Sequence, residues 1–131
     1  MKEAIVAAGP SVTIKDTPIP QISHPHQLII RVVVSGSNPK DWKYPEFMKL
    51  TMNSGDDIAG VVHAVGDEVT EFKVGDRVAS FHEMRTAGGS FAEYAVGWDW
   101  STFHLPKNTT YEGTFSSAYS YDLSRNPLLI T

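Results

Sequence analysis

Two lysines that follow a strand-like run are the residues of this chain best suited to chemistry. Lys40 and Lys43 lie in the segment 37–43, which reads SNPKDWK. A lysine ammonium group stabilises negative charge that develops on an oxygen atom, and it acts as an acid only when its pKa is lowered toward neutrality. Residues three apart are neighbours on a helix, so a helix here would place both ammonium groups roughly on one side. The alternative is that both lysines are ordinary solvated charges.

The residues around these lysines predict a short helix. Asn38 is a good N-cap, and Pro39 suits the first helical position, where its missing N–H has no intrahelical partner to lose. Asp41 then lies where a carboxylate favours the positive end of the helix, which makes it a helix-start residue rather than a catalytic base. Pro45 disfavours helical geometry at Tyr44, so we expect about one or two turns.

The five histidines are weaker candidates for a site. His24 and His26 form a lone H-x-H pair with no third ligand in register, which is weak evidence for a metal site. His63 lies in a strand-like run and is expected to be a partly buried packing residue. The spacing of His82 and His104 does not tie either of them to a site.

Composition limits the class of protein. The chain has 131 residues and 41% hydrophobic content, enough for one domain with a single core. The net charge of -4 and the absence of Lys/Arg-rich runs argue against a nucleic acid or a membrane surface as partner. There is no cysteine, so disulfides and thiolate metal sites are excluded. No apolar run approaches the ~18 residues of a membrane span, and we expect a soluble, cytoplasmic protein.

Runs of β-branched and apolar residues predict a mainly β fold. The run 28–35 is apolar on both faces apart from Arg31, as expected of a central strand. The run 11–16 alternates polar and apolar residues and therefore predicts one buried face. Gly-Asp steps at 66–67 and 75–76 predict tight turns, because Gly reaches positive φ and Asp can hydrogen-bond its own backbone. The predicted strands span residues 2–7, 11–16, 28–35, 58–65, 77–81, 90–96 and 103–106.

Trp98 and Trp100 form an aromatic pair after the strand predicted for residues 90–96. At alternating spacing on an extended chain they share one face. The pair is therefore expected either to pack under the sheet or to contact a partner.

Four segments, taken in order, resemble a known family. They read SGSNPKDWK, SGDDIAGVVHAVGDEVTEFKVGDRVASF, GGSFAEYAV and the pair Leu105-Pro106. This series is similar to the N-terminal GroES-like domain of medium-chain dehydrogenases/reductases, within them to zinc-independent quinone reductases and trans-acting enoyl reductases. The resemblance covers residues 1–113 and implies a GroES-like, partly open β-barrel with one or two short helices. Residues 114–131 show no clear periodicity and are expected to form a divergent C-terminal tail.

Departures from the family pattern concern the metal and the cofactor. Zinc-dependent relatives carry a Cys and a Gly-His-Glu where this chain has Ser37-Asn38 and Gly55-Asp56-Asp57, so we expect no zinc. Relatives continue into a Rossmann domain whose glycine-rich turn holds the dinucleotide pyrophosphate. No G-x-G-x-x-G occurs in this sequence, so that cofactor domain is expected to be absent. The resemblance implies NADPH as cofactor, but we expect this chain alone to bind it weakly.

The resemblance also implies roles for the lysine segment. In intact relatives the active site lies in the cleft between the two domains, and an N-P-x-D-x-K segment faces it. Asn38, Pro39 and Asp41 are therefore implied as cofactor-binding residues that line the cleft. Lys43 is implied as the catalytic residue, which hydrogen-bonds or protonates a carbonyl substrate while an activated C=C bond is reduced.

Three functions remain open at this point, and whether the chain is an enzyme stays open with them. It is a truncated, zinc-independent enoyl-reductase-like oxidoreductase of a biosynthetic, for example polyketide, pathway, completed by a cofactor domain. Alternatively it is a non-catalytic accessory or binding domain, or a cofactor-free isomerase or cyclase that reuses the cleft. The expected partners are a small-molecule or carrier-bound substrate, and a synthase or second copy that covers the exposed domain-interface surface.

Overall fold

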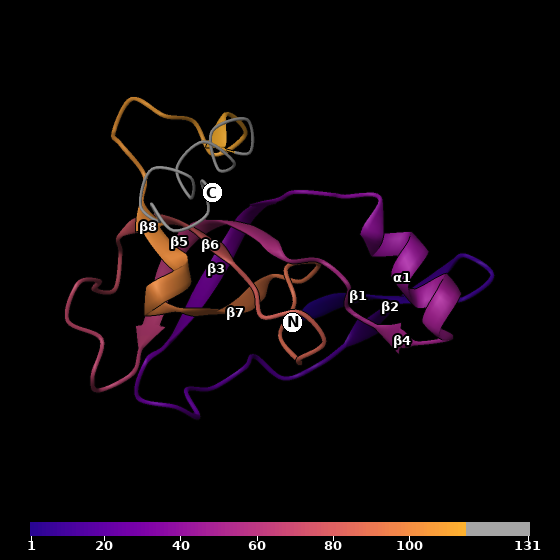
Figure 1. Cartoon of the computed structure of the whole chain (residues 1–131). Helices are drawn as coiled ribbons and strands as arrows, with labels where there is room; N and C mark the ends of the chain where they lie inside the picture. Colours follow the sequence, from indigo (N-terminus) through magenta and orange to yellow (C-terminus); the bar gives the residue numbers. More distant parts are fainter. Residues whose placement is uncertain (115–131) are drawn as a thin grey trace, which may run out of the picture.

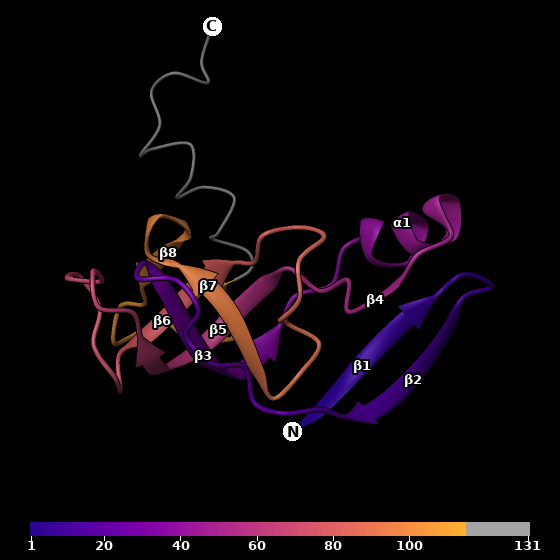
Figure 2. The same ribbon diagram turned by 90° about the horizontal axis from the view of Figure 1, so that it is seen from below.

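The structure, a computed structural model, describes residues 1–114 as a mainly β fold with one α-helix (Figures 1 and 2). The expected tail at 114–131 lies outside this range apart from its first residue. None of the helices within residues 1–114 has the length and apolar character needed to cross a bilayer. The elements are β1 (Lys2–Ala7), β2 (Ser11–Asp16), β3 (Gln27–Ser35), α1 (Lys40–Met48), β4 (Thr51–Met52), β5 (Asp57–Val65), β6 (Arg77–Phe81), β7 (Tyr94–Trp98), the 3₁₀ turn η1 (Asp99–Ser101) and β8 (Thr102–His104).

The larger sheet has five antiparallel strands in the order β7-β3-β5-β6-β8. β3 lies inside the sheet between β5 and β7, which confirms the prediction of a central strand. The β3–β5 pairing shifts register twice, between Ile29 and Ile30 and between Val32 and Val34. Such bulges increase local twist and bend the strand. The sheet accordingly curls into a half-barrel, and the partly open barrel implied by the family resemblance is confirmed (Figure 2).

The main core lies inside the curl of this sheet. Two of its members, Val69 and Phe72, come from the irregular segment between β5 and β6 rather than from a strand. Burial of such side chains stabilises the fold by about 1.5–3 kcal/mol each. The buried cluster contains Leu28, Ile30, Ile58, Val62, Val69, Phe72, Val78 and Ala95.

The two Gly-Asp steps in the β5–β6 connection are turns for different reasons. Gly75 has φ +94°, as predicted for a glycine that needs the left-handed region. Gly66 does not have positive φ; a Cβ atom there would collide with the carbonyl oxygen of Pro25. The Asp76 carboxylate accepts a hydrogen bond from the Lys73 backbone N–H at 3.0 Å, not from the backbone two residues later.

The smaller sheet has three strands in the order β2-β1-β4. The predicted hairpin at residues 2–16 is confirmed, with β1 and β2 paired in full register. The predicted buried face of β2 is wrong: all six positions are exposed, including Val12 at 64% and Ile14 at 62%. Alternation decides which residues share a face, but burial also needs a second layer, and the described residues place none over β2.

Helix α1 continues through Pro45 and spans nine residues, so the prediction that this proline ends it is wrong. A proline inside a helix lacks the N–H that would bond to the carbonyl four residues earlier. That carbonyl belongs to Asp41, and it accepts a hydrogen bond from the Ser54 hydroxyl at 2.7 Å instead. The helix therefore tolerates Pro45 because a residue after β4 replaces the missing donor.

The start of α1 also differs from the prediction. Pro39, not Asn38, occupies the N-cap position, and no side chain caps the helix there. The Asn38 side-chain amide instead donates to Asp57 at 2.7 Å. The Asp41 carboxylate lies in the first turn, as predicted, and accepts the backbone N–H of Asn38 at 2.7 Å. The Asp41 carboxylate therefore ties the loop residue Asn38 to the first turn of the helix, and no side chain accepts from the first N–H groups of the helix at its N-cap.

Strand β7 begins later and ends later than the predicted strand at 90–96. The residues just before it bond to the smaller sheet: the Ala4 N–H donates to the Phe91 carbonyl at 2.8 Å, and the Glu93 N–H donates to the Lys2 carbonyl at 3.2 Å. The segment therefore crosses from one sheet to the other. The alternation of side chains continues along residues 90–96, but the pairing partner changes from β1 to β3 within this segment.

Candidate functional site

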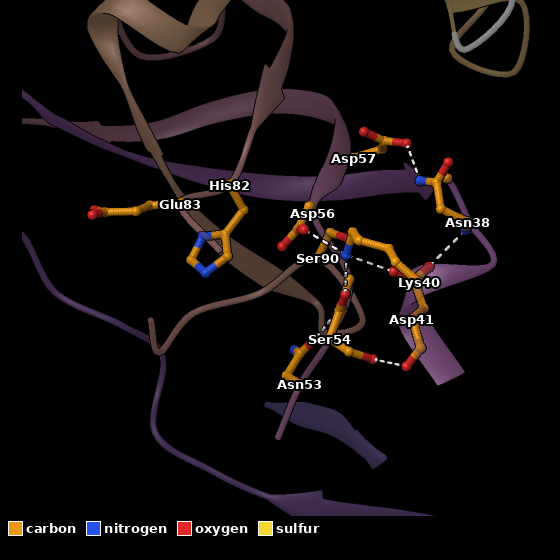
Figure 3. A network of polar contacts seen from close by, with 12 residues as sticks. Asn38, Lys40, Asp41, Asn53, Ser54, Asp56, Asp57, His82, Glu83 and Ser90 are labelled. Atoms are coloured by element: carbon orange, nitrogen blue, oxygen red, sulfur yellow. Dashed lines mark hydrogen bonds and ion pairs between the residues drawn. The ribbon is translucent and has the colours of Figure 1, made fainter. Parts of the chain in front are cut away.

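A cluster of polar side chains gathers where α1 and β5 begin (Figure 3). The β3–α1 loop supplies Asn38, and the first turn of the helix supplies Lys40 and Asp41. The segment between β4 and β5 supplies Ser54 and Asp56. Local sequence places each residue at an element end, and the pairing of β5 beside β3 brings the two ends together.

Lys40 is the cation at the centre of this group. Its Nζ donates to an Asp41 carboxylate oxygen at 2.6 Å and to the Ser54 carbonyl at 2.8 Å. It also forms an ion pair with Asp56 Oδ2 at 2.5 Å. That oxygen is buried, and it has the ion pair but no well-aligned hydrogen bond. We call Lys40, Asp41 and Asp56 the Lys40 cluster.

Burial and the ion-pair contacts shift the pKa values of the Lys40 cluster in opposite directions. Burial alone would lower the pKa of Lys40, but its hydrogen bonds and charge interactions with Asp41 and Asp56 outweigh this and raise the pKa. Burial raises the pKa of Asp56, and Lys40 and His82 offset only part of that effect. The site thus stabilises the charged form of Lys40, whereas burial destabilises the charged form of Asp56.

The predicted cofactor-binding residues differ in how much of each side chain is engaged. The Asn38 amide donates to Asp57, and the two Asp41 carboxylate oxygens contact Asn38 and Lys40. Pro39 between them is exposed. The structure therefore brings these residues together at the start of α1, with Pro39 facing solvent and the two polar side chains turned to internal partners.

The predicted catalytic residue, Lys43, has surroundings unlike those of Lys40. It is exposed, and its Nζ lies 5.5 Å from the centre of the Trp42 ring. Among the described residues it has no ion pair. The alternative that both lysines are ordinary solvated charges is therefore wrong for Lys40, which is a partly buried cation with internal partners, whereas Lys43 is exposed at the surface.

Sequence reasoning singled out Lys40 as a candidate but missed its partners and therefore its role in the cluster. The partners Ser54 and Asp56 lie beyond the rest of α1 and beyond β4, so spacing along the helix could not reveal them. One signal was present, because Asp56 and Asp57 stand side by side before an apolar strand, and a carboxylate entering a core needs a cation.

The histidines lie outside the Lys40 cluster. His82 is buried, with Nδ1 2.8 Å from the Val96 carbonyl oxygen and Nε2 3.1 Å from the Thr86 hydroxyl. It holds the loop that follows β6. His63 is exposed against Tyr94, so the expectation of a partly buried residue is wrong. Residues 1–114 contain no group of three or more potential metal ligands.

A second group of charges forms around His26. Its Nδ1 lies 2.7 Å from Asp99 and its Nε2 lies 2.9 Å from Glu68, and we call these three residues the His26 cluster. Trp98 and Trp100 stack beside it with ring centres 4.8 Å apart, so the pair packs against itself. The hydrogen bond that His26 donates to Asp99 has the largest influence on the pKa of His26, and the two carboxylates together raise that pKa.

Comparison with known proteins places these features in context. The alcohol dehydrogenase GroES-like domain profile matches residues 24–107. Trans-enoyl reductase fsr4 of Gibberella fujikuroi is 54% identical over 114 residues, 86% of this chain and 33% of that protein. Human quinone oxidoreductase is 36% identical over 100 residues, 72% of this chain and 29% of that protein. The chain thus spans about a third of the length of these curated relatives.

A solved structure shows the same likeness in three dimensions. A mycobacterial protein complexed with NADPH superposes with a TM-score of 0.71 at 29% identity. The match covers 86% of this chain and 36% of the mycobacterial one.

Proposed function

Because this chain belongs to the family of alcohol dehydrogenase GroES-like domains, we propose that it forms the substrate-side half of a zinc-independent enoyl reductase. The observation that carries the proposal is the contrast between two lysines on α1. Lys40 is tied into an internal cluster, and Lys43 is left exposed one turn of helix later. The 54% identity to a trans-enoyl reductase supports a biosynthetic reduction of an activated C=C bond.

In this proposal Lys43 supplies the charge that the reaction needs. Conjugate reduction of an enoyl group places negative charge on the carbonyl oxygen, and a nearby ammonium group stabilises that charge. The Lys40 cluster fixes the start of α1 and so fixes the direction in which Lys43 leaves the helix. Asn38, Pro39 and Asp41 shape the cofactor-facing side of the same loop, and NADPH supplies the hydride when bound.

The chemistry of the donor set supports a site that works without zinc. In place of metal ligands, Asp56 has the Lys40 ammonium and Asp57 has the Asn38 amide. A divalent cation would have to compete with the Lys40 ammonium group, which already neutralises the Asp56 carboxylate. Zinc also prefers thiolate and imidazole ligands, which the cluster lacks.

The proposal includes a separate cofactor-binding domain that lies outside residues 1–131. Helix α1 exposes large apolar side chains that such a domain could cover, with Trp42 at 51%, Phe47 at 78% and Met48 at 53% exposure. A synthase or a second copy of the chain could cover the same residues. A soluble monomer rarely leaves apolar side chains gathered on one helix without a partner.

A chimera tests the proposed reduction. Residues 1–114 would replace the matching third of the Gibberella trans-enoyl reductase, and oxidation of NADPH by an enoyl thioester would be followed. We expect the chimera to be active and the Lys43→Ala variant to lose about 10²-fold in kcat. The matched control is Lys15→Ala on β2, which should keep full activity.

Two results would contradict the proposal. An unchanged rate for Lys43→Ala in an active chimera would remove that residue from the mechanism. Tight binding of NADPH to the 131-residue chain alone would contradict the separate cofactor domain. A folded but inactive chimera, in turn, would favour an accessory binding domain or cofactor-free chemistry.

A further inference from the structure

A hollow of about 610 Å³ lies between β1, β4, α1 and the segment that follows β6. Figure 2 shows β1, β4 and α1 at the end of the molecule that carries the smaller sheet. One wall is apolar, formed by Ile5, Met48, Leu50 and Met52. Its volume is within the range of small-molecule sites in proteins. The hollow is therefore large enough for a small organic ligand.

Tyr44 gives this hollow an unusual polar group. The residue lines the hollow, and its hydroxyl is buried with no hydrogen-bond partner among the described residues. Buried polar groups in proteins are nearly always paired, and an unpaired one costs about 1–3 kcal/mol. The Tyr44 hydroxyl is therefore a hydrogen-bond donor that lacks an acceptor among the described residues, in a side chain that lines the hollow.

Arg85 adds a second hydrogen-bond donor to the lining of the hollow, beside Tyr44. Its guanidinium group lies 5.1 Å from the centre of the Tyr44 ring, and Arg85 lines the hollow. Within residues 1–114 it has no ion pair. Its backbone has φ 69°, a conformation uncommon for residues other than Gly, Asn and Asp. Glu3, the acid of the lining, is engaged with the Asn53 amide at 3.1 Å.

We propose that this hollow binds an amphiphile with an apolar chain and a carboxylate head group. The exposed guanidinium of Arg85 would pair with the carboxylate, which is the acceptor best matched to an arginine, and the hydroxyl of Tyr44 would donate to it once the ring turns toward the hollow. The apolar chain would lie along Ile5, Leu50 and the two methionines, whose flexible side chains adapt to ligands of different shape. Binding needs neither NADPH nor the proposed reduction, so the two proposals fail independently.

Titrations of the full chain with octanoate, octanol and octylamine test this inference. The three probes share one apolar chain and differ in head-group charge. Isothermal titration calorimetry should give the tightest binding for octanoate and the weakest for octylamine. Amide shifts in ¹H–¹⁵N spectra should locate octanoate at Tyr44, Met48, Met52 and Arg85. Equal affinities for the three probes, or shifts elsewhere, would overturn the proposal.

Variants separate the head-group contact from the apolar wall. Arg85→Ala should weaken octanoate binding about tenfold and leave octanol binding unchanged. Met48→Trp, which fills the hollow from an exposed helix position, should abolish binding of both probes. Phe47→Trp is its control, because Phe47 is exposed on the same helix and does not line the hollow. Octanoate binding that survives Met48→Trp, or that weakens equally in Phe47→Trp, would contradict the site.

Discussion

Two ion clusters in this protein have the same plan and opposite surroundings. Each places one basic side chain between two carboxylates from different segments: Lys40 between Asp41 and Asp56, and His26 between Glu68 and Asp99. The carboxylates of the Lys40 cluster are 8% and 3% exposed, whereas those of the His26 cluster are 64% and 21% exposed. Solvent therefore screens the carboxylates of the second cluster far more than those of the first, while the two basic side chains are similarly exposed, Lys40 at 29% and His26 at 34%.

The difference shows what an ion cluster contributes in each setting. Removal of one partner from a buried pair leaves an uncompensated charge in a poorly solvated place, which costs far more than the pair itself contributes. An exposed pair contributes little, because water replaces a lost partner. The Lys40 cluster should therefore be essential to the fold around α1, and the His26 cluster should only adjust stability with pH.

Loss of the buried cation should give the largest effect. We expect Lys40→Met to lower the free energy of unfolding by about 3 kcal/mol, because Asp41 and Asp56 would then repel each other in a buried site. Urea denaturation followed by tryptophan fluorescence measures the change. Lys43→Met, on the same helix but exposed, is the matched control and should change stability by less than about 0.5 kcal/mol. Equal losses in the two variants would show that the cluster is no more important than a surface charge.

Loss of the hydrogen bond from the Ser54 hydroxyl to the Asp41 carbonyl should have an intermediate effect on stability. Ser54→Ala leaves the Asp41 carbonyl unpaired beside the cluster and should cost about 1–2 kcal/mol of unfolding free energy. Pro45→Ala restores a backbone N–H for the same carbonyl, so in that background Ser54→Ala should cost less than about 0.5 kcal/mol. The control is Ser37→Ala, at an exposed loop position. A Ser54→Ala cost that is the same in both backgrounds would contradict the replacement.

The strands could be predicted from sequence because their signals are local. β1 and β2 occupy the predicted ranges, and β3, β5 and β6 differ by at most one residue at one end. Composition and glycine turns decide where the chain extends. The faces were less predictable, since burial of β2 depends on a second layer that no residue of the strand itself specifies.

The site could be predicted only in part, for a related reason. Asn38, Asp41 and Lys43 could be named as candidates because they belong to one short segment with helix-start chemistry, and their roles stay predictions. Lys40 has its partners in another segment, so its role depends on how β5 pairs with β3. The effect of Pro45 was misjudged in the same way, because the donor that compensates for it, Ser54, comes from beyond β4.

Disruption of the His26 cluster should have the smallest effect on stability, and that effect should depend on pH. The pKa of His26 is raised above its usual value of 6.5 by the hydrogen bond that it donates to Asp99 and by the charges of Asp99 and Glu68. A group whose pKa is raised by folding stabilises the protein fully below its unfolded pKa and loses that contribution as the pH rises through its folded pKa. The difference in urea midpoint between the wild type and His26→Gln should therefore be larger at about pH 5.5 than at about pH 8.5. His63→Gln, at an exposed position with no carboxylate partner among the described residues, is the control and should show no such trend. A His26→Gln difference that is constant with pH would mean that packing against Trp100, not charge, carries the contribution of this residue.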